Sequence, residues 1–146
     1  MKKPKISVII PAKNSERTIG KCLNSVLNQR YAPLEVIVVD ARSTDRTRNI
    51  AEKHGVTVLI EPYHEKSAPG IGRNHGTKSA KGDILAFLDS DCYPEKTWLN
   101  QVINVFKNQV GIYSIIVSDG TEKIVSRAFH YLHMEIHYDF APSRCM

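Results

Sequence analysis

The chain has 146 residues, of which 42% are hydrophobic and 24% are charged, and its formal net charge is +5. This length and composition are typical of one globular domain with its own core. No apolar run approaches the roughly 20 residues of a membrane-spanning helix, and no signal peptide is recognised at the N-terminus. The 20 basic and 15 acidic residues are spread along the chain. That distribution favours small anionic ligands or a membrane surface over nucleic acid as partners.

The cysteines are odd in number and lack C-x-x-C spacing, which predicts neither a disulfide framework nor a zinc site; they are Cys22, Cys92 and Cys145. A reducing, cytoplasmic setting is therefore expected. The basic N-terminus, with Lys2, Lys3 and Lys5, is most simply a solvated chain end. A peripheral contact with the inner face of a membrane is the alternative interpretation.

The first predicted elements are a strand and a helix. Residues 5–10 form a short apolar run that ends at Pro11. Apolar residues then recur at the spacing i, i+3, i+4, i+7, which predicts a helix over 19–27. Asn14 or Ser15 is expected to cap that helix.

The same order of elements then repeats. Residues 34–39 predict a second buried strand, which ends at Asp40. Residues 43–54 predict a helix whose first three residues offer capping oxygens, and Gly55 is expected to end it in the left-handed conformation. Residues 56–60 predict a third strand.

A polar loop over 61–69 leads to a predicted helix at 70–81. One face of that helix carries only small residues, Gly72, Gly76 and Ala80. Residues 84–88 are continuously apolar and predict a fourth strand, buried on both faces. A further helix is expected over 94–106, with Pro94 in its first turn.

Four strands that alternate with helices predict an α/β fold: a mostly parallel sheet with helices on both faces, in three α/β/α layers. We expect residues 1–110 to form this α/β unit, with a ligand-binding role. Residues 111–146 predict a strand, a turn and an amphipathic helix of the same domain. Ligands of such sheets bind beyond the carboxyl ends of the strands.

Three strand ends carry polar side chains that suit an anionic ligand. The fourth strand delivers Asp89 and Asp91, which share one side of an extended chain or fan out around one ligand in a turn. Two neighbouring carboxylates repel each other, and a divalent cation that also binds diphosphate oxygens is a common reason for such a pair. A solvated acidic turn is the alternative. The first strand ends at 11–13 and the second at Asp40, so the polar groups converge.

Four segments, in this order, resemble the nucleotide-binding half of glycosyltransferase family 2. They are S-V-I-I-P-A-K-N from Ser7, E-V-I-V-V-D-A-R-S-T-D from Glu35, G-I-G-R-N-H-G from Gly70 and A-K-G-D-I-L-A-F-L-D-S-D from Ala80. The resemblance implies the GT-A fold, which is Rossmann-like, and inverting transfer of a sugar from a nucleotide donor to an acceptor hydroxyl. It also implies Mg²⁺ or Mn²⁺ as the cofactor.

The resemblance further implies a base-binding role for three residues. Pro11 and Lys13 match the segment that flanks the base, and Asp40 matches the acidic residue that contacts it. From the residues alone, capping of the turn that follows is the alternative interpretation of Asp40. Ala41 and Arg42 stand where the family commonly has a second acidic residue, so a UDP-sugar is only the default donor.

For the diphosphate side, the resemblance implies that Arg73 reaches the nucleotide, that Asp89 lies near the ribose and metal, and that Asp91 binds the metal directly. The chemistry agrees, because a metal and a planar guanidinium both offset diphosphate charge. An exposed helical arginine is the alternative interpretation of Arg73.

The family's catalytic base lies in an acceptor-binding half, and only 55 residues follow Asp91 (146 minus 91). We therefore expect a chain that is truncated before that half and lacks the base. The carboxylates of the tail match no family motif; they are Glu122, Glu135 and Asp139. The acceptor, whether a glycan, a lipid or a protein, is not identified. A non-catalytic nucleotide-sugar-binding module, or a subunit completed by a second chain, is the alternative function, and self-association is expected at any uncovered apolar surface.

Overall fold

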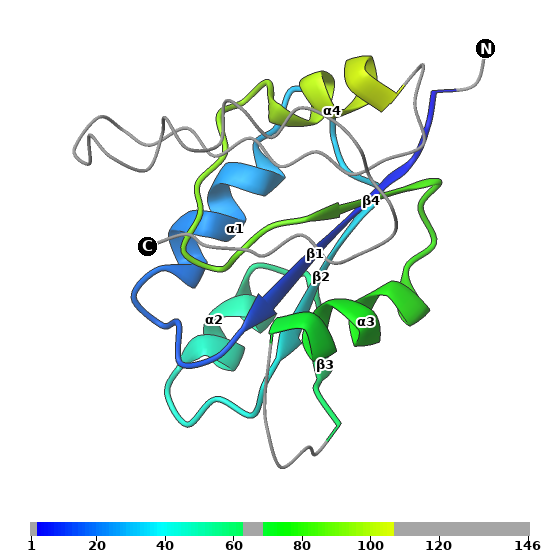
Figure 1. Cartoon of the computed structure of the whole chain (residues 1–146). Coiled ribbons are helices and arrows are strands. Elements are labelled where there is room, and N and C mark those ends of the chain that lie inside the picture. The colour runs from blue at the N-terminus through cyan, green and yellow to red at the C-terminus, as the bar shows by residue number, and fades with distance from the viewer. Residues whose placement is uncertain (1–2, 63–68, 107–146) are drawn as a thin grey trace, which may run out of the picture.

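The structure is a computed structural model that describes residues 3–62 and 69–106 (Figure 1). The strand, turn and helix expected within 111–146 lie outside the described residues, and the proposed domain boundary at residue 110 stays a prediction. Eight elements alternate as predicted; in chain order they are β1 (Ile6–Ala12), α1 (Ile19–Leu27), β2 (Glu35–Asp40), α2 (Thr47–Lys53), β3 (Thr57–Ile60), α3 (Pro69–Ser79), β4 (Ile84–Phe87) and α4 (Trp98–Phe106).

The four strands form one parallel sheet in the order β3-β2-β1-β4. In register, Ala12 of β1 lies beside Asp40 of β2, and Asp40 lies beside Ile60 of β3. Because all four strands run the same way, their carboxyl ends meet at one edge of the sheet. The predicted α/β fold with a parallel sheet is confirmed for the described residues.

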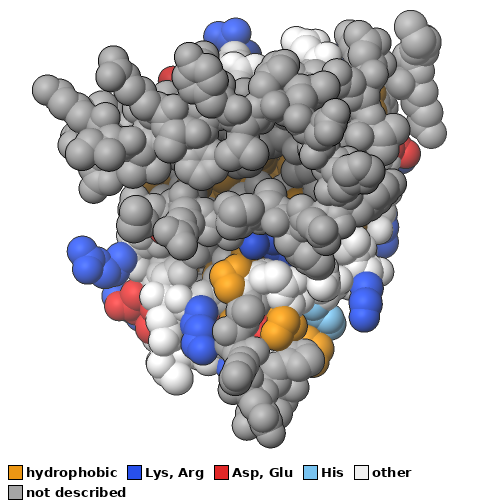
Figure 2. Space-filling view, in the orientation of Figure 1, with side chains coloured by type: hydrophobic (Ala, Val, Ile, Leu, Met, Phe, Trp, Pro, Cys, Tyr) orange, Lys and Arg blue, Asp and Glu red, His pale blue; other side chains and the backbone are white. Residues whose placement is uncertain are grey.

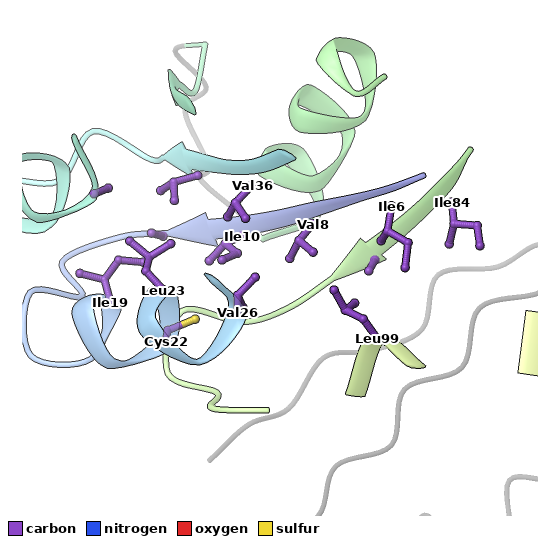
Figure 3. Close-up of a cluster of buried hydrophobic side chains, with 14 residues drawn as sticks. Ile6, Val8, Ile10, Ile19, Cys22, Leu23, Val26, Val36, Ile84 and Leu99 are labelled. Carbon is purple, nitrogen blue, oxygen red and sulfur yellow. The ribbon is translucent and has the colours of Figure 1, made fainter. Parts of the chain in front are cut away.

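Helices cover both faces of this sheet, which gives the three expected layers. Strand alternation sends side chains of β1, β2 and β4 toward α1, α2 and α4, and Figure 3 shows the main cluster between β1 and α1. The residues labelled there are Ile6, Val8, Ile10, Ile19, Cys22, Leu23, Val26, Val36, Ile84 and Leu99. On the other face, Ile9, Ile37 and Val39 form a smaller buried cluster beneath α3.

The predicted small-residue face of α3 lies against the sheet. Gly72 and Gly76 are the buried residues of this helix. A Cβ atom built on Gly76 would lie 2.6 Å from Cγ2 of Ile9 and 3.1 Å from Cγ2 of Val39. The absence of side chains at these positions therefore lets the backbone of α3 approach β1 and β2 directly, which fixes the position of the residues that α3 presents at the carboxyl edge.

The prediction that 84–88 is a strand buried on both faces is only partly right. β4 ends at Phe87, and Leu85 and Phe87 are only partly buried, whereas Ile84 and Ala86 are buried. The reason is the position of β4 at one end of the described sheet. α3 packs over β1 and β2, so it covers the neighbouring side of β4 less completely.

The predicted cap of α1 is wrong. Thr18 occupies the N-cap position and makes no side-chain capping bond. The backbone carbonyl of Ser15 accepts hydrogen bonds from the N–H groups of Thr18 and Ile19, at 3.0 and 2.9 Å. This turn places Ser15 before the helix, and Asn14 points instead toward the loop after β2.

Two other predicted boundaries shift. α2 begins at Thr47, although Oδ1 of Asp45 does accept from the Thr47 N–H at 2.9 Å. Gly55 is left-handed, with φ of 72°, as predicted. α4 begins at Trp98, so the expectation that Pro94 stands in its first turn is wrong. The carbonyl of Glu95 in the intervening segment is bound by the Gln29 side chain at 2.7 Å, which holds that segment as a turn.

No helix within residues 3–62 and 69–106 has both the length and the hydropathy needed to cross a membrane. Lys and Arg side chains appear at several separate points of the described surface on the face seen in Figure 2. This arrangement matches the spread of basic residues along the sequence.

Candidate functional site

The carboxyl edge of the sheet brings the predicted polar segments together. Backbone hydrogen bonds beyond the strands hold the edge: Ala41 N–H donates to the carbonyl of Ala12 at 2.8 Å, and Leu88 N–H donates to that of Ile9 at 3.1 Å. The loops that start at residues 13, 41 and 88 therefore leave the sheet side by side. The expected convergence of these strand ends is confirmed.

Arg73 and Asp89 form an ion pair at this edge. Nη2 of Arg73, on α3, lies 2.5 Å from Oδ1 of Asp89, after β4. Their side chains are 18% and 22% exposed, so the pair is mostly shielded from water but can still be reached by a ligand. The exposed-arginine interpretation of Arg73 is wrong, because the side chain is mostly buried and paired with Asp89.

Asp89 and Asp91 are arranged by a turn. The N–H of Cys92 donates to the carbonyl of Asp89 at 3.0 Å, so the two carboxylates fan out from a tight bend. Asp91 is exposed, yet its pKa is raised by loss of hydration and, further, by the negative charge of Asp89. A raised pKa means that the charged form of Asp91 is disfavoured until a cation compensates it.

Hydrogen bonds from hydroxyl and thiol groups hold this turn in place. The Oγ atoms of Ser90 and Ser15 lie 2.8 Å apart, which links the turn to the loop after β1. Cys22 of α1 donates its Sγ–H to the carbonyl of Asp89 at 3.6 Å. Burial raises the pKa of the Cys22 thiol to about 12, with further contributions from Asp91 and Asp89, so it stays a neutral donor.

Asp40 lies at the same edge but on the other face of the sheet. It continues the alternation of Val36 and Val38 toward α1 and α2, and only 2% of it is exposed. Both carboxylate oxygens accept from the Ser43 N–H at 3.3 Å. Asp40 therefore caps the turn that follows it, which was the alternative interpretation, and the weak geometry of these two bonds leaves acceptor capacity on the carboxylate.

Pro11 and Lys13 occupy different environments. Pro11 is half-buried beside α3, because a Cβ atom on Gly72 would lie 3.1 Å from its Cβ. Lys13 is exposed just after the carboxyl end of β1. Its carbonyl accepts a hydrogen bond from Ser15 Oγ at 3.2 Å. The structure thus brings Pro11 close to the Arg73 helix, while Lys13 extends toward solvent.

A pair of loops, after β1 and after β2, is tied together by Asn14. Its φ of 48° is left-handed. The Asn14 N–H donates to Ser43 Oγ at 2.9 Å, and its Oδ1 accepts from the Thr44 N–H, also at 2.9 Å. Asn14 therefore holds the loop that contains Lys13 against the loop that follows Asp40.

Glu61 also lies at the carboxyl edge of the sheet, although its sequence context predicts a polar loop. It follows β3 directly, is 4% exposed, and its Oε2 would lie 3.3 Å from a Cβ on Gly72. Like Asp40, Glu61 is a carboxylate at the end of a strand. This shared position is the sequence feature that could have identified it. On the α3 face, the edge thus carries Pro11, Glu61 and the Arg73–Asp89 pair.

These residues could hold a divalent cation only together with a ligand. No group of three or more His, Cys, Asp or Glu side chains with metal-binding geometry occurs within 3–62 and 69–106. Asp89 and Asp91 supply two hard oxygen-bearing groups, and a hard cation would need further oxygens, such as those of a diphosphate and water. The chemistry of this donor set fits a metal that arrives with a phosphorylated ligand.

Comparison with known proteins gives the family. The profile described as "Glycosyl transferase family 2" matches residues 7–144. Glycosyltransferase AglE of Haloferax volcanii is 41% identical over 108 residues, which cover 69% of this chain and 35% of that protein. The putative teichuronic acid biosynthesis glycosyltransferase TuaG of Bacillus subtilis is 34% identical over 82% of this chain and 50% of its own length. The chain thus spans half or less of these two relatives.

Solved structures agree. Glucosyl-3-phosphoglycerate synthase from Mycobacterium tuberculosis, in complex with Mn²⁺, UDP and glucosyl-3-phosphoglycerate, superposes with a TM-score of 0.62 at 27% identity, over 70% of this chain and 39% of that one. TarS 1–349 of S. aureus superposes with a TM-score of 0.61 at 32% identity, over 76% and 39%. The GT-A fold expected from the motifs is confirmed, and the chain belongs to glycosyl transferase family 2.

Proposed function

We propose that this chain forms the donor-binding part of an inverting glycosyltransferase, which uses a nucleotide-diphosphate sugar and Mg²⁺ or Mn²⁺ to glycosylate an acceptor hydroxyl. The observation that carries the proposal is the Arg73–Asp89 ion pair beside the exposed Asp91, at the carboxyl edge of a parallel sheet. UDP-sugars are the default donors. The solved relative with Mn²⁺ and UDP supports the donor class and the cofactor class.

Each site residue has a distinct proposed role. Asp91 and Asp89 would hold the metal, which when bound supplies a Lewis acid for the departing nucleoside diphosphate. Arg73 turns from Asp89 toward the diphosphate, to which its planar fork donates hydrogen bonds. Asp40 would accept a hydrogen bond from an N–H of the base, and the segment that contains Pro11 and Lys13 would flank the base.

The attacking hydroxyl must lose a proton, and the resemblance assigns that step to none of the described residues. The tail carboxylates Glu122, Glu135 and Asp139 lie outside the described residues. This observation keeps the second candidate function in view: a module, or a subunit completed by a second chain, that binds a nucleotide sugar without transferring it. The two candidates share the donor site and differ in turnover.

Calorimetric titration tests the donor site. UDP-, GDP- and dTDP-sugars are titrated into the full chain with and without Mn²⁺. We expect metal-dependent binding of at least one donor, and Asp91→Asn should weaken it tenfold or more. Asp83→Asn, an exposed aspartate at the opposite edge of the sheet, is the matched control and should bind as the parent does. Metal-independent binding, or equal effects of the two substitutions, would contradict the proposed site.

Release of nucleoside diphosphate then separates the two candidates. Slow release that Asp91→Asn abolishes supports the transferase. Binding without any release, in the presence of simple glycosides and phosphorylated acceptors, supports the binding module. A supplied second chain that restores release would identify the incomplete-subunit form.

A further inference from the structure

An open hollow lies at the amino edge of the sheet, opposite the donor site. Its volume is about 360 Å³, and it is formed by the segment before β1 and by the segment between α1 and β2. The described residues that line it are Lys3, Pro4, Lys5, Arg30, Tyr31, Ala32 and Leu34. In Figure 1 this edge lies toward the N-terminus, at the end of β1 away from its arrowhead.

The walls of the hollow are held in place by hydrogen bonds from backbone and side chain. The Tyr31 hydroxyl donates to the carbonyl of Pro4. The Leu34 N–H donates to the carbonyl of Ile6 at 2.8 Å, and the Lys5 N–H donates to Asp83 Oδ2, also at 2.8 Å. The hollow is therefore built into the start of the sheet rather than formed by a loose chain end.

The hollow is cationic. Lys3, Lys5 and Arg30 are exposed, and none of them takes part in the ion pairs found among the described residues. No Asp or Glu is among the described lining residues. An occupant that neutralises this surface must therefore be anionic.

The same edge also exposes apolar side chains. Leu34 is 45% exposed on the rim of the hollow, and Leu27, at the end of α1, is 43% exposed. Large apolar side chains beside several cations match the chemistry of a bilayer interface, where headgroup phosphates meet acyl chains. A nucleic acid would use the cations but not the leucines, and a second copy of this chain would bring the same three cations into repulsion.

We infer that this edge, defined by Lys3, Lys5, Arg30 and Leu34, docks the protein on a membrane surface that contains anionic phospholipid. The seven residues of β1 would hold the donor-site edge roughly 20 Å from the lipid surface. A water-soluble nucleotide sugar could then enter from the aqueous side. The inference is independent of the proposed donor chemistry, and either can fail without the other.

Vesicle sedimentation tests it with the full chain. Vesicles of phosphatidylcholine alone are compared with vesicles that contain about one third phosphatidylglycerol. We expect binding to the anionic vesicles only, weakened by salt. Lys3→Gln/Lys5→Gln/Arg30→Gln should reduce the partition coefficient about 100-fold, since each basic residue near the surface contributes about fivefold. Leu34→Asn should reduce it several-fold while the salt dependence remains.

A matched triple variant controls for net charge. Arg17→Gln/Arg46→Gln/Arg48→Gln removes three exposed cations near the starts of α1 and α2, and it should bind vesicles nearly as the parent does. Thermal midpoints and far-UV circular dichroism show that both variants are folded. Equal binding by the two triple variants would overturn the inference, as would no binding by the parent. A dimer, or a complex with a DNA duplex, that depends on the same residues and forms in place of vesicle binding would also overturn it.

Discussion

Arg73 and Asp89 are joined across 16 residues of sequence by a contact of 2.5 Å between a helix and a strand end. The pair forms because Gly72 and Gly76 let α3 lie directly on β1 and β2, which carries the Arg73 side chain to the carboxyl edge. In the absence of a donor the guanidinium offsets part of the charge of Asp89. A diphosphate and a cation would replace that contact with stronger ones on both sides.

Arg73→Gln should therefore affect both binding and stability. We expect metal-dependent UDP affinity to fall about tenfold or more and the free energy of unfolding to fall by about 1–2 kcal/mol, because Asp89 loses a mostly buried charged partner. Calorimetry and urea denaturation measure the two effects. Lys78→Gln, an exposed cation in the last turn of α3, should change neither. Unaltered UDP affinity in Arg73→Gln would remove this residue from the donor site.

Asp91→Asn should stabilise the protein while it weakens metal binding. The pKa of Asp91 is raised in the folded state by loss of hydration and by Asp89. The charged carboxylate therefore costs stability above its folded pKa, and this cost disappears as the pH falls below the ordinary value of 3.8. Without metal, we expect a higher unfolding midpoint for Asp91→Asn at pH 7 and a smaller difference near pH 3.5.

The same linkage gives the pH dependence of metal binding. Mn²⁺ competes with protons for Asp91, so its affinity should begin to fall at a higher pH than for an ordinary aspartate. Titrations of Mn²⁺ with UDP between pH 4 and 7 measure this. A destabilised Asp91→Asn protein at neutral pH, or a metal affinity that is constant over this range, would contradict the assignment.

Gly76→Ala should destabilise the fold. The new Cβ would lie 2.6 Å from Ile9 Cγ2 and 3.1 Å from Val39 Cγ2, so either α3 or the core must move. The expected loss is about 1–3 kcal/mol in the free energy of unfolding. Gly70→Ala, in the same helix, meets no atom within 4 Å and should be neutral or slightly stabilising. Similar losses in the two variants would show that helix propensity, rather than packing, is being measured.

Asn14 should tolerate glycine better than alanine. Its φ of 48° is left-handed, and its Oδ1 accepts from Thr44 N–H at 2.9 Å. Asn14→Gly loses the hydrogen bond and keeps the backbone conformation, for an expected loss of about 1 kcal/mol. Asn14→Ala adds roughly another 1 kcal/mol of backbone strain. Urea denaturation gives both values, and faster amide exchange at Thr44 is expected in both variants. Equal stability of the two variants would show that the backbone is not strained there.

The sequence predicted the helices and strands well wherever the apolar residues followed one clear periodicity. Strand and helix order, the glycine face of α3 and the left-handed Gly55 all follow from local patterns. Boundaries were less accurate where side chains found tertiary partners. The loop around Asn14 bonds to the loop after β2 instead of capping α1, and the carbonyl of Glu95 is held by Gln29, which follows α1. Such contacts leave no trace in the spacing of neighbouring residues.

By itself, the sequence determined the α/β class, the parallel sheet and the polar character of its carboxyl edge, because alternating apolar runs and strand-end residues are local properties of the chain. Only the tertiary structure decided that Arg73 pairs with Asp89. It also decided that the side chains of Asp40 and Pro11 lie on opposite faces of the sheet, and that Glu61 is buried beside Gly72. These relationships depend on how closely α3 approaches the sheet and on which strands are neighbours. Both are fixed by packing between segments that are far apart in sequence.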